Sequence, residues 1–440
     1  MPSTHFPMLN RQLAPPVFQV SNLLLPHPKV VKLDNGIPLY VLDFPDYEVL
    51  KVEAVFHAGR PQEEKRLAAR ATSRMMREGT SQRSGAEIAE HFDFYGASFS
   101  VPTNLDMANF MLFSLTKYAA DVIPVFAELL HDPIFPEVEL ETFRRNSIQE
   151  LSVELEKVET LAYRKVTELI FGENHPYGYN SVAEDYLAIQ AADLQHFYDQ
   201  WYAPANCQLF ASGRVDEDTI KLLNQHFGGK GVSLGHQSSQ SNWKTFNEPS
   251  HAETMVGKQR NIHLPHPGSL QTAIKIGRRT FGKRHPDFNG LFVLSSMLGG
   301  YFGSRLMEQV REKKGYTYNI YSTLDAYLND GCFYIATEVD PVNAAATVKA
   351  IFAEMKKLRD KPVPPEELEM VRNYLLGMLL NGLDGPINTS DMVRSIIAED
   401  LPWESFATMV EAIRTITPEE LQVLAQRYLQ VADFWTVTVG

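Results

Sequence analysis

The chain has 440 residues, a length typical of two or three domains, and 44% of them are apolar, which excludes a wholly disordered or collagen-like protein. Its 54 acidic and 41 basic residues give a formal net charge of −13, which disfavours a general nucleic-acid binder. Two cysteines, Cys207 and Cys332, are too few for a disulfide framework or a four-cysteine zinc module.

The N-terminal residues predict an irregular arm. Prolines stand close together there, at Pro2, Pro7, Pro15 and Pro16, so residues 1–18 are not expected to join the fold. No apolar stretch typical of a signal peptide is present, and no apolar run approaches the ~20 residues of a membrane helix. We therefore expect a soluble protein of the cytoplasm, or of the periplasm if a leader has been removed, with no membrane partner.

The following residues alternate between strand and helix patterns. Strands are predicted over residues 39–42 and 52–56, beside long helices. A helix is predicted to begin at Pro136, because proline suits the first turn and the glutamates behind it suit the positive end of the helix dipole. Another amphipathic helix begins near Ile189 and leads into a short apolar strand that ends at Gly213.

The second part of the chain repeats the first. A run rich in glycine, serine and glutamine, residues 228–241, has the composition of a linker. Beyond it, residues 416–440 match residues 189–213 without a gap, 227 positions further along. A second match, 228 positions apart, pairs residues 364–372 with residues 136–144. Two separate matches at nearly one offset indicate a duplication rather than a chance likeness between amphipathic helices.

The duplication predicts an α+β fold of two homologous tandem domains, each a mainly antiparallel sheet packed with helices. We expect the N-terminal arm over residues 1–18 and the first domain over residues 19–226. A linker is expected over residues 227–249, and the second domain over residues 250–440.

Several catalytic signatures are absent from the sequence. No two of the 13 histidines are four residues apart, so a helical zinc site of the HExxH or HxxEH type is excluded, although a site assembled from scattered residues stays open. No G-x-S-x-G nucleophile elbow occurs. Residues 277–284 resemble a phosphate loop for seven positions, but Arg284 stands where Ser or Thr would bind Mg²⁺. We interpret this stretch as a basic, solvated turn.

One stretch resembles a known family. Residues 298–318, LGGYFGSRLMEQVREKKGYTY, are similar to the C-terminal-domain motif of the M16 metallopeptidases, the pitrilysin and mitochondrial-processing-peptidase family. In that family an arginine and a tyrosine seven positions apart hold the peptide backbone near the metal. The resemblance therefore implies that Arg311 and Tyr318 bind substrate. Residue type alone would instead favour a solvated helix end for Arg311 and a half-buried strand for Tyr318.

A second stretch is similar to the family's HxxEH region but has lost its ligands. Aligned on the Gly-Thr pair at residues 79–80, the HxxEH positions hold Arg70, Ser73 and Arg74, and the third ligand falls near Glu150. Arginine offers no lone pair and stays charged, so these degenerate positions should not hold zinc. Ser73 cannot replace the glutamate as general base. We expect Glu150 to be a relic or a salt-bridge partner of Arg70 or Arg74.

The resemblance extends through residues 174–178 and 202–206, and so over nearly the whole chain. It implies a zinc-less, non-catalytic subunit of the two-chain M16B type, inactive alone and without a cofactor of its own. As a heterodimer with an HxxEH-bearing M16 partner that carries zinc, it would hold the peptide substrate in a composite active site.

Two other functions stay open at this point. The chain could be a structural or assembly subunit of a larger complex, as the core subunits of respiratory complexes with this fold are. The regulatory subunit of the mitochondrial processing enzyme is a further relative, but it has a longer glycine-rich loop than residues 299–303 and a transit peptide. The sequence leaves the peptide substrate and the cleavage specificity open.

Overall fold

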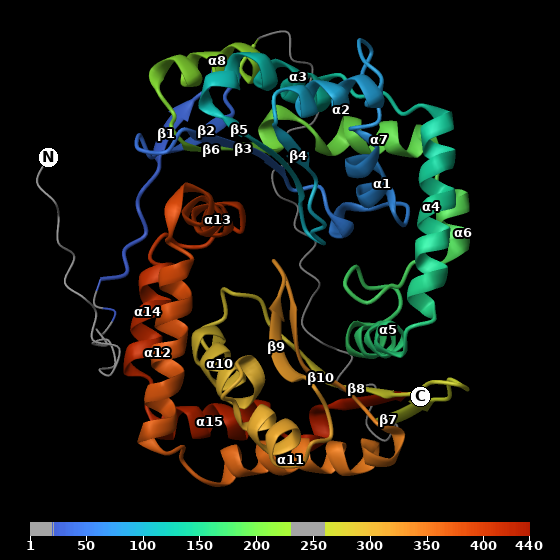
Figure 1. Cartoon of the computed structure of the whole chain (residues 1–440), viewed down its shortest axis with the longest axis vertical. Helices are drawn as coiled ribbons and strands as arrows, with labels where there is room; N and C mark the ends of the chain where they lie inside the picture. Colours follow the sequence, from blue (N-terminus) through green and yellow to red (C-terminus); the bar gives the residue numbers. More distant parts are fainter. Residues whose placement is uncertain (1–19, 21, 230–259) are drawn as a thin grey trace, which may run out of the picture.

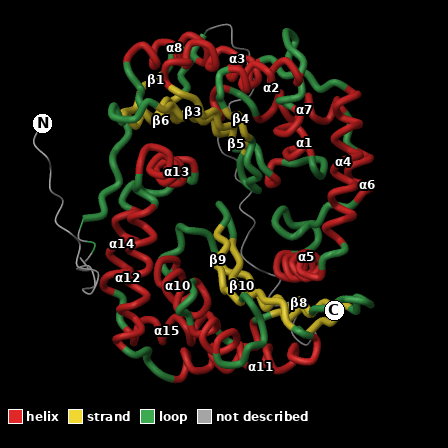
Figure 2. Tube along the Cα trace, viewed as in Figure 1, coloured by secondary structure: helices red, strands yellow, loops and turns green. Residues whose placement is uncertain are grey.

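The computed structural model describes residue 20, residues 22–229 and residues 260–440 (Figure 1). The predicted arm, and the predicted linker beyond residue 229, lie outside the described residues. Each half of the described chain forms one sheet that is packed with helices (Figure 2). The predicted α+β fold of two tandem domains is therefore confirmed. Among the described helices, none is long and apolar enough to cross a membrane.

The sheet of the first half has the strand order β1-β2-β6-β3-β5-β4. Its neighbours pair antiparallel except β2 with β6, which are parallel. The described strands are β1 (Lys29–Lys32), β2 (Pro38–Asp43), β3 (Val49–Phe56), β4 (Ser98–Ser100), β5 (Ala108–Leu115) and β6 (Cys207–Gly213). The described helices are α1 (Ala68–Met75), α2 (Gly85–Phe94), α3 (Ala119–His131), α4 (Glu137–Leu155), α5 (Val158–Phe171), α6 (Ala183–Ala188), α7 (Ala191–Trp201) and α8 (Glu217–Phe227).

The sheet of the second half has the order β7-β11-β8-β10-β9, with β7 and β11 as its parallel pair. Its strands are β7 (Asn261–Leu264), β8 (Thr272–Thr280), β9 (Ile320–Ala326), β10 (Gly331–Val339) and β11 (Trp435–Val439). The described helices are α10 (Phe288–Ser295), α11 (Ala344–Asp360), α12 (Pro365–Asn381), α13 (Gly385–Ala398), α14 (Ser405–Thr415) and α15 (Pro418–Tyr428). Two π-helical segments lie between α10 and β9, at Ser296–Gly300 and Met307–Glu312.

The helices repeat the offset found in the sequence. The start of α13 lies 227 positions after the start of α5, and the starts of α15 and α7 are separated by the same offset. The two helices of each pair have the same length. The starts of α4 and α12 are 228 positions apart, and each helix follows a proline and carries glutamates in its first turn. The predicted proline–glutamate helix starts are therefore confirmed.

Each half contributes one helix to the sheet of the other half. α5 packs on β8 and β11, whereas α13 packs on β6 and β2 (Figure 1). The contact of α5 is largely apolar: its buried Ala162, Val166 and Ile170 share one core with Ala336 and Val437 of the second sheet. This burial removes apolar surface of both halves from water and holds the halves together. The contact also includes one ion pair, between Glu159 of α5 and the buried Lys275 of β8, at 3.0 Å. This exchange of helices was not predicted from the sequence.

The contact of α13 with the first sheet holds a larger set of buried charges. Glu53 of β3 is completely buried, and Lys51 on the same strand is 2% exposed. The Lys51 Nζ lies 2.6 Å from the Glu53 Oε2 and 2.8 Å from the Asp391 Oδ1 of α13. The Arg394 Nε, also on α13, lies 3.1 Å from the Glu53 Oε1. Every buried charge in this contact thus has a partner of opposite sign, as burial in a low dielectric requires.

Candidate functional site

The degenerate HxxEH positions lie on the short helix α1, whose N-terminus is anchored by Glu63. The Glu63 carboxylate accepts hydrogen bonds from the Ala69 backbone N–H at 3.0 Å and from the Tyr179 hydroxyl at 2.5 Å. Leu67 precedes the helix with φ of +71°, a left-handed conformation rare for a branched residue. Burial raises the pKa of Glu63 to about 7, although Tyr179 and the nearby Arg60 favour the ionised form.

The side chains of α1 do not gather as metal ligands would. Arg70 donates to the Tyr186 hydroxyl at 3.3 Å, and the Ser73 hydroxyl donates to the carbonyl of Arg70 at 3.1 Å. Arg74 is exposed and lines a groove together with Glu150, which α4 contributes. The groove has a volume of about 220 Å³. Its lining residues come from α1, the turn after it and α4: Arg74, Arg77, Glu78, Glu139, Thr142, Phe143, Asn146, Ser147 and Glu150.

This groove does not fit a zinc ion. Two guanidinium groups stand where two imidazoles would be needed, and neither has a lone pair to offer the metal. Nowhere in the described residues do three His, Cys, Asp or Glu side chains gather closely enough to hold a metal. Glu150 forms no ion pair with Arg70 or Arg74, all three of which are described, so the predicted salt bridge is not present, and the carboxylate faces the open groove.

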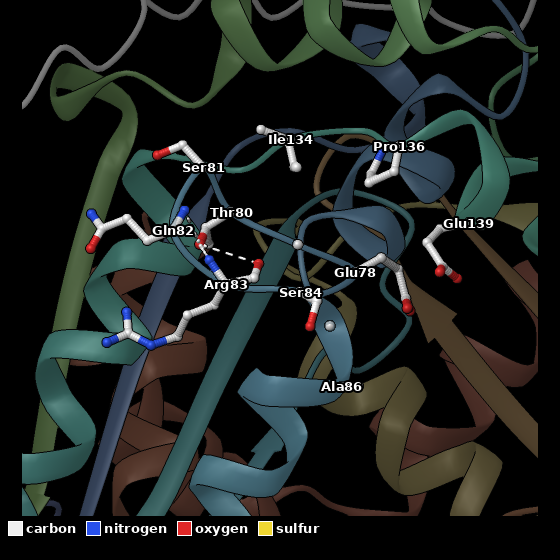
Figure 3. Close-up of a pocket in the computed structure, with 12 residues that line it drawn as sticks. Glu78, Thr80, Ser81, Gln82, Arg83, Ser84, Ala86, Ile134, Pro136 and Glu139 are labelled. Carbon is white, nitrogen blue, oxygen red and sulfur yellow. Dashed lines mark hydrogen bonds between the residues drawn. The ribbon is translucent and has the colours of Figure 1, made fainter.

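A larger hollow adjoins the groove and was not predicted from the sequence. It measures about 600 Å³, lies between the loop at residues 78–86 and residues 134–139, and shares Glu78 and Glu139 with the groove. Figure 3 shows Arg83 reaching away from these two glutamates. Arg83 pairs with Glu128 of α3, so the hollow presents hydroxyls and carboxylates rather than a free cation.

Arg311 lies in the second half, in the π-helical segment Met307–Glu312. Three residues after the segment the chain turns at Gly315, whose φ is +64° and whose N–H donates to the Arg311 carbonyl at 3.0 Å. The Arg311 guanidinium carbon lies 4.7 Å from the centre of the Phe302 ring. Among the described residues its nearest carboxylate is that of Glu312, 3.6 Å from the Arg311 Nε, too far for a good hydrogen bond. The donors of Arg311 are thus left for another acceptor.

Tyr318 is exposed, in contrast to the half-buried strand position that residue type alone favoured. Its side chain is 89% exposed, directly before β9. The backbone around it is held by Thr317, whose hydroxyl oxygen lies 2.7 Å from the Glu338 carbonyl and 2.9 Å from the Asn319 carbonyl, so its single O–H can donate to either. Arg311 and Tyr318 line neither of the two hollows described above. The predicted site residues therefore form two separate groups, one in each half of the chain.

The duplication places a counterpart of the groove near Arg311. The exposed face of α12 carries Met370, Tyr374 and Met378, which lie 228 positions after Thr142, Asn146 and Glu150 of α4. In the first half the turn at Arg77 and Glu78 and the helix α4 border the open groove. In the second half Tyr301 stacks on Tyr374, with ring centres 4.8 Å apart and an angle of 24° between the planes. An aromatic pair thus stands at the position where the first half has an open, charged groove.

Comparison with known proteins gives a consistent assignment. Residues 48–176 match the family model described as insulinase, peptidase family M16, and residues 188–375 match the model described as peptidase M16 inactive domain. A Bacillus subtilis protein named as a zinc protease is 24% identical over 315 residues, which are 70% of this chain and 73% of that protein. A Mycobacterium tuberculosis protein named in the same way is 23% identical over 368 residues, 82% and 81% of the two chains.

Solved structures share the fold of the chain. A peptidase M16 inactive domain from Pseudomonas fluorescens superposes with a TM-score of 0.81 at 21% identity, covering 94% of this chain and 98% of that one. A protease from Helicobacter pylori superposes with the same TM-score at 16% identity, covering 94% and 100%. Both likenesses extend over the two halves of the chain.

Proposed function

The chain belongs to the M16 peptidase family, and from that premise we propose that it is the non-catalytic, substrate-binding subunit of a heterodimeric zinc metallopeptidase. The observation that carries this proposal is the contrast between the two groups of site residues. The metal-ligand positions hold Arg70, Ser73 and Arg74, whereas Arg311 and Tyr318 keep the family's spacing and are available at the surface.

The chemistry of α1 argues against hydrolysis by this chain alone. The zinc protease activity in the names of relatives cannot be assumed for this chain, because two of the positions that ligate zinc in the family hold arginine here. The position of the family's general base holds Ser73, whose hydroxyl is engaged by the Arg70 carbonyl. We therefore assign the metal and the general base to an HxxEH-bearing M16 partner, and no catalytic residue to this chain alone.

Arg311 and Tyr318 can bind a peptide without a metal on this chain. A guanidinium has five N–H donors, and Arg311 faces no carboxylate of the described residues within good hydrogen-bond distance. It can donate to a peptide carbonyl. The Tyr318 hydroxyl, on a side chain that is 89% exposed, can donate to the scissile carbonyl oxygen and stabilise the negative charge that develops there. Both donors are neutral or cationic, as an oxyanion site needs.

Reconstitution tests this function. Zinc content and cleavage of an unfolded, fluorogenic peptide are measured for this chain alone, for an HxxEH-bearing M16 chain alone, and for their mixture. We expect no stoichiometric zinc and no cleavage from the lone chain, and a higher kcat/KM in the mixture than with the partner alone. Stoichiometric zinc in the lone chain, or a mixture no more active than the partner, would contradict the proposal.

The alternative function, a structural or assembly subunit without a proteolytic role, makes the opposite prediction for the same mixture. Association with a larger assembly would then persist, while changes at Arg311 and Tyr318 would leave proteolysis unaltered. The availability of both side chains favours the substrate-binding function, because the exposed Tyr318 and the Arg311 guanidinium, 3.6 Å from its nearest described carboxylate, can both still donate to a peptide.

A further inference from the structure

The turn that precedes Arg311 is packed tightly on both sides. A Cβ added at Gly299 would lie 2.5 Å from the backbone nitrogen of Ser322 in β9, so the turn approaches that strand closely. A Cβ at Gly303 would lie 2.8 Å from the ring of Tyr301. Tyr301 is itself held against Tyr374 of α12. The glycines and Tyr301 therefore fix the turn against the rest of the second half.

Phe302 is the large side chain of this turn that points outward. Its side chain is 63% exposed, although Gly299 is buried one turn before it and Ser304 is 1% exposed two residues later. An exposed phenylalanine on a rigid turn keeps apolar surface in water and contributes little to the core, so packing within the chain does not explain it.

Phe302 is joined to Arg311 by a cation–π contact. The guanidinium carbon lies 4.7 Å from the ring centre, so the cation stands over one face of the ring. The cation–π attraction uses the charge of the guanidinium, and its N–H groups stay available to an acceptor. Phe302 thereby holds Arg311 near the turn, and the exposed surface of the ring lies beside those donors.

The equivalent turn of the first half is polar. There the turn holds Arg77 and Glu78 before its glycine, and the Arg77 Nε lies 3.1 Å from the Glu78 Oε1. The second half has Tyr301 and Phe302 before Gly303 instead. α12, on which Tyr301 of this turn stacks, also exposes apolar side chains: Met370 is 58% exposed and Met378 is 40% exposed. Exposed apolar side chains and a hydrogen-bond donor thus occur together in the half that carries Arg311.

We propose that Phe302 is a specificity-determining residue, which selects peptides with an aromatic or aliphatic side chain next to the carbonyl that Arg311 holds. This inference rests on the proposed function, because it takes the carbonyl–Arg311 contact as given. The occupant is an extended peptide segment: its main-chain carbonyl meets the guanidinium edge, and its apolar side chain covers the outer surface of Phe302 and the methionines of α12. Segments of this kind are exposed in unfolded proteins rather than folded ones.

Binding of two matched peptides to the whole chain tests the inference. The probes are fluorescein-labelled, unstructured 12-residue peptides that differ at one central position, Phe in one and Asn in the other. Fluorescence anisotropy gives their Kd values. We expect the Phe peptide to bind about tenfold more tightly than the Asn peptide, a difference of about 1.4 kcal/mol. Phe302→Ala should remove the preference, and Phe302→Trp should retain it.

Two controls separate the possible failures. Phe94→Ala removes a phenylalanine that is 80% exposed at the end of α2, and it should leave the preference unchanged. Arg311→Ala should weaken both peptides by the same factor, since both present the same main chain. Equal Kd values for the two peptides, or a preference that survives Phe302→Ala, would overturn the inference about Phe302. If Arg311→Ala still weakened both peptides in that case, the proposed function would stand. No effect of Arg311→Ala on either peptide would overturn both.

Discussion

The two halves of the chain share a backbone plan but treat equivalent surfaces in opposite ways. In the first half, the exposed face of α4 borders an open groove lined by charged and polar groups, including Arg74 and Glu150. In the second half, the same face of α12 carries methionines, and the stacked rings of Tyr301 and Tyr374 cover part of it. A duplicated fold can thus keep its helices in place while the side chains on one face diverge completely.

The exchanged helices are alike in one respect and differ in another. Each places a carboxylate against a buried lysine of the other half's sheet: Glu159 of α5 lies 3.0 Å from Lys275 of β8, and Asp391 of α13 lies 2.8 Å from Lys51 of β3. In the first sheet a further buried charge, Glu53, joins the lysine and also pairs with Arg394 of α13. Because removal of one member of a buried ion network leaves the others uncompensated, the contact of α13 should be the more sensitive to single substitutions.

The largest expected effect is on the charged contact. Glu53→Gln leaves Lys51 buried without its closest carboxylate, and we expect the free energy of unfolding to fall by about 3–5 kcal/mol in urea titrations. The matched control is Glu217→Gln, which breaks an exposed ion pair with Lys29 and should cost less than about 1 kcal/mol. Equal losses in the two variants would contradict the special sensitivity of the buried charges.

The next effect concerns activity. In the reconstituted complex, Arg311→Ala should lower kcat/KM by about 10²–10³-fold, or about 2.7–4 kcal/mol, comparable to the loss of one oxyanion donor. Arg214→Ala is the control, because Arg214 also has only a loose carboxylate neighbour, with its NH1 nitrogen 3.8 Å from the Glu48 Oε1. An unchanged kcat/KM for Arg311→Ala would exclude this residue from substrate binding.

A smaller effect is expected from glycine substitutions that probe the packed turn of the second half. Gly299→Ala forces a methyl group against the Ser322 backbone, so the free energy of unfolding should fall by about 1–3 kcal/mol. Gly377→Ala, in the middle of α12 with open space around it, should instead raise stability by about 0.4–1 kcal/mol. Thermal denaturation of both variants measures the difference in sign.

The smallest effect is a pH slope in the first half. The folded-state pKa of Glu63 is about 7, above its ordinary value of 4.5, so the folded chain binds this proton more tightly than the unfolded chain does. The resulting stability is fully present below pH 4.5 and is lost as the pH rises to 7. Glu63→Gln should flatten this slope by at most about 1.4 kcal/mol per pH unit. An unchanged slope in urea titrations between pH 5 and pH 7 would contradict the assignment.

Local patterns in the sequence predicted the helix starts at α4 and α12, because capping and the helix dipole act within one turn. The duplication and the α+β class followed from the repeated offset. The loss of zinc ligation at Arg70 and Arg74 is likewise a matter of residue chemistry, which holds whatever the fold does with the side chains.

The tertiary structure alone decided how these pieces meet. The exchange of α5 and α13 depends on contacts between residues more than 100 positions apart. Hydrophobic periodicity indicates which face of a helix is buried, but it does not indicate which element covers that face. The same limit applies to the candidate site. The spacing of Arg311 and Tyr318 can be recognised in the sequence. The exposure of Tyr318 and the contact between Phe302 and Arg311 depend on how the turn packs on β9 and α12. The sequence determined which groups are available, and packing over long distances determined which of them face the solvent.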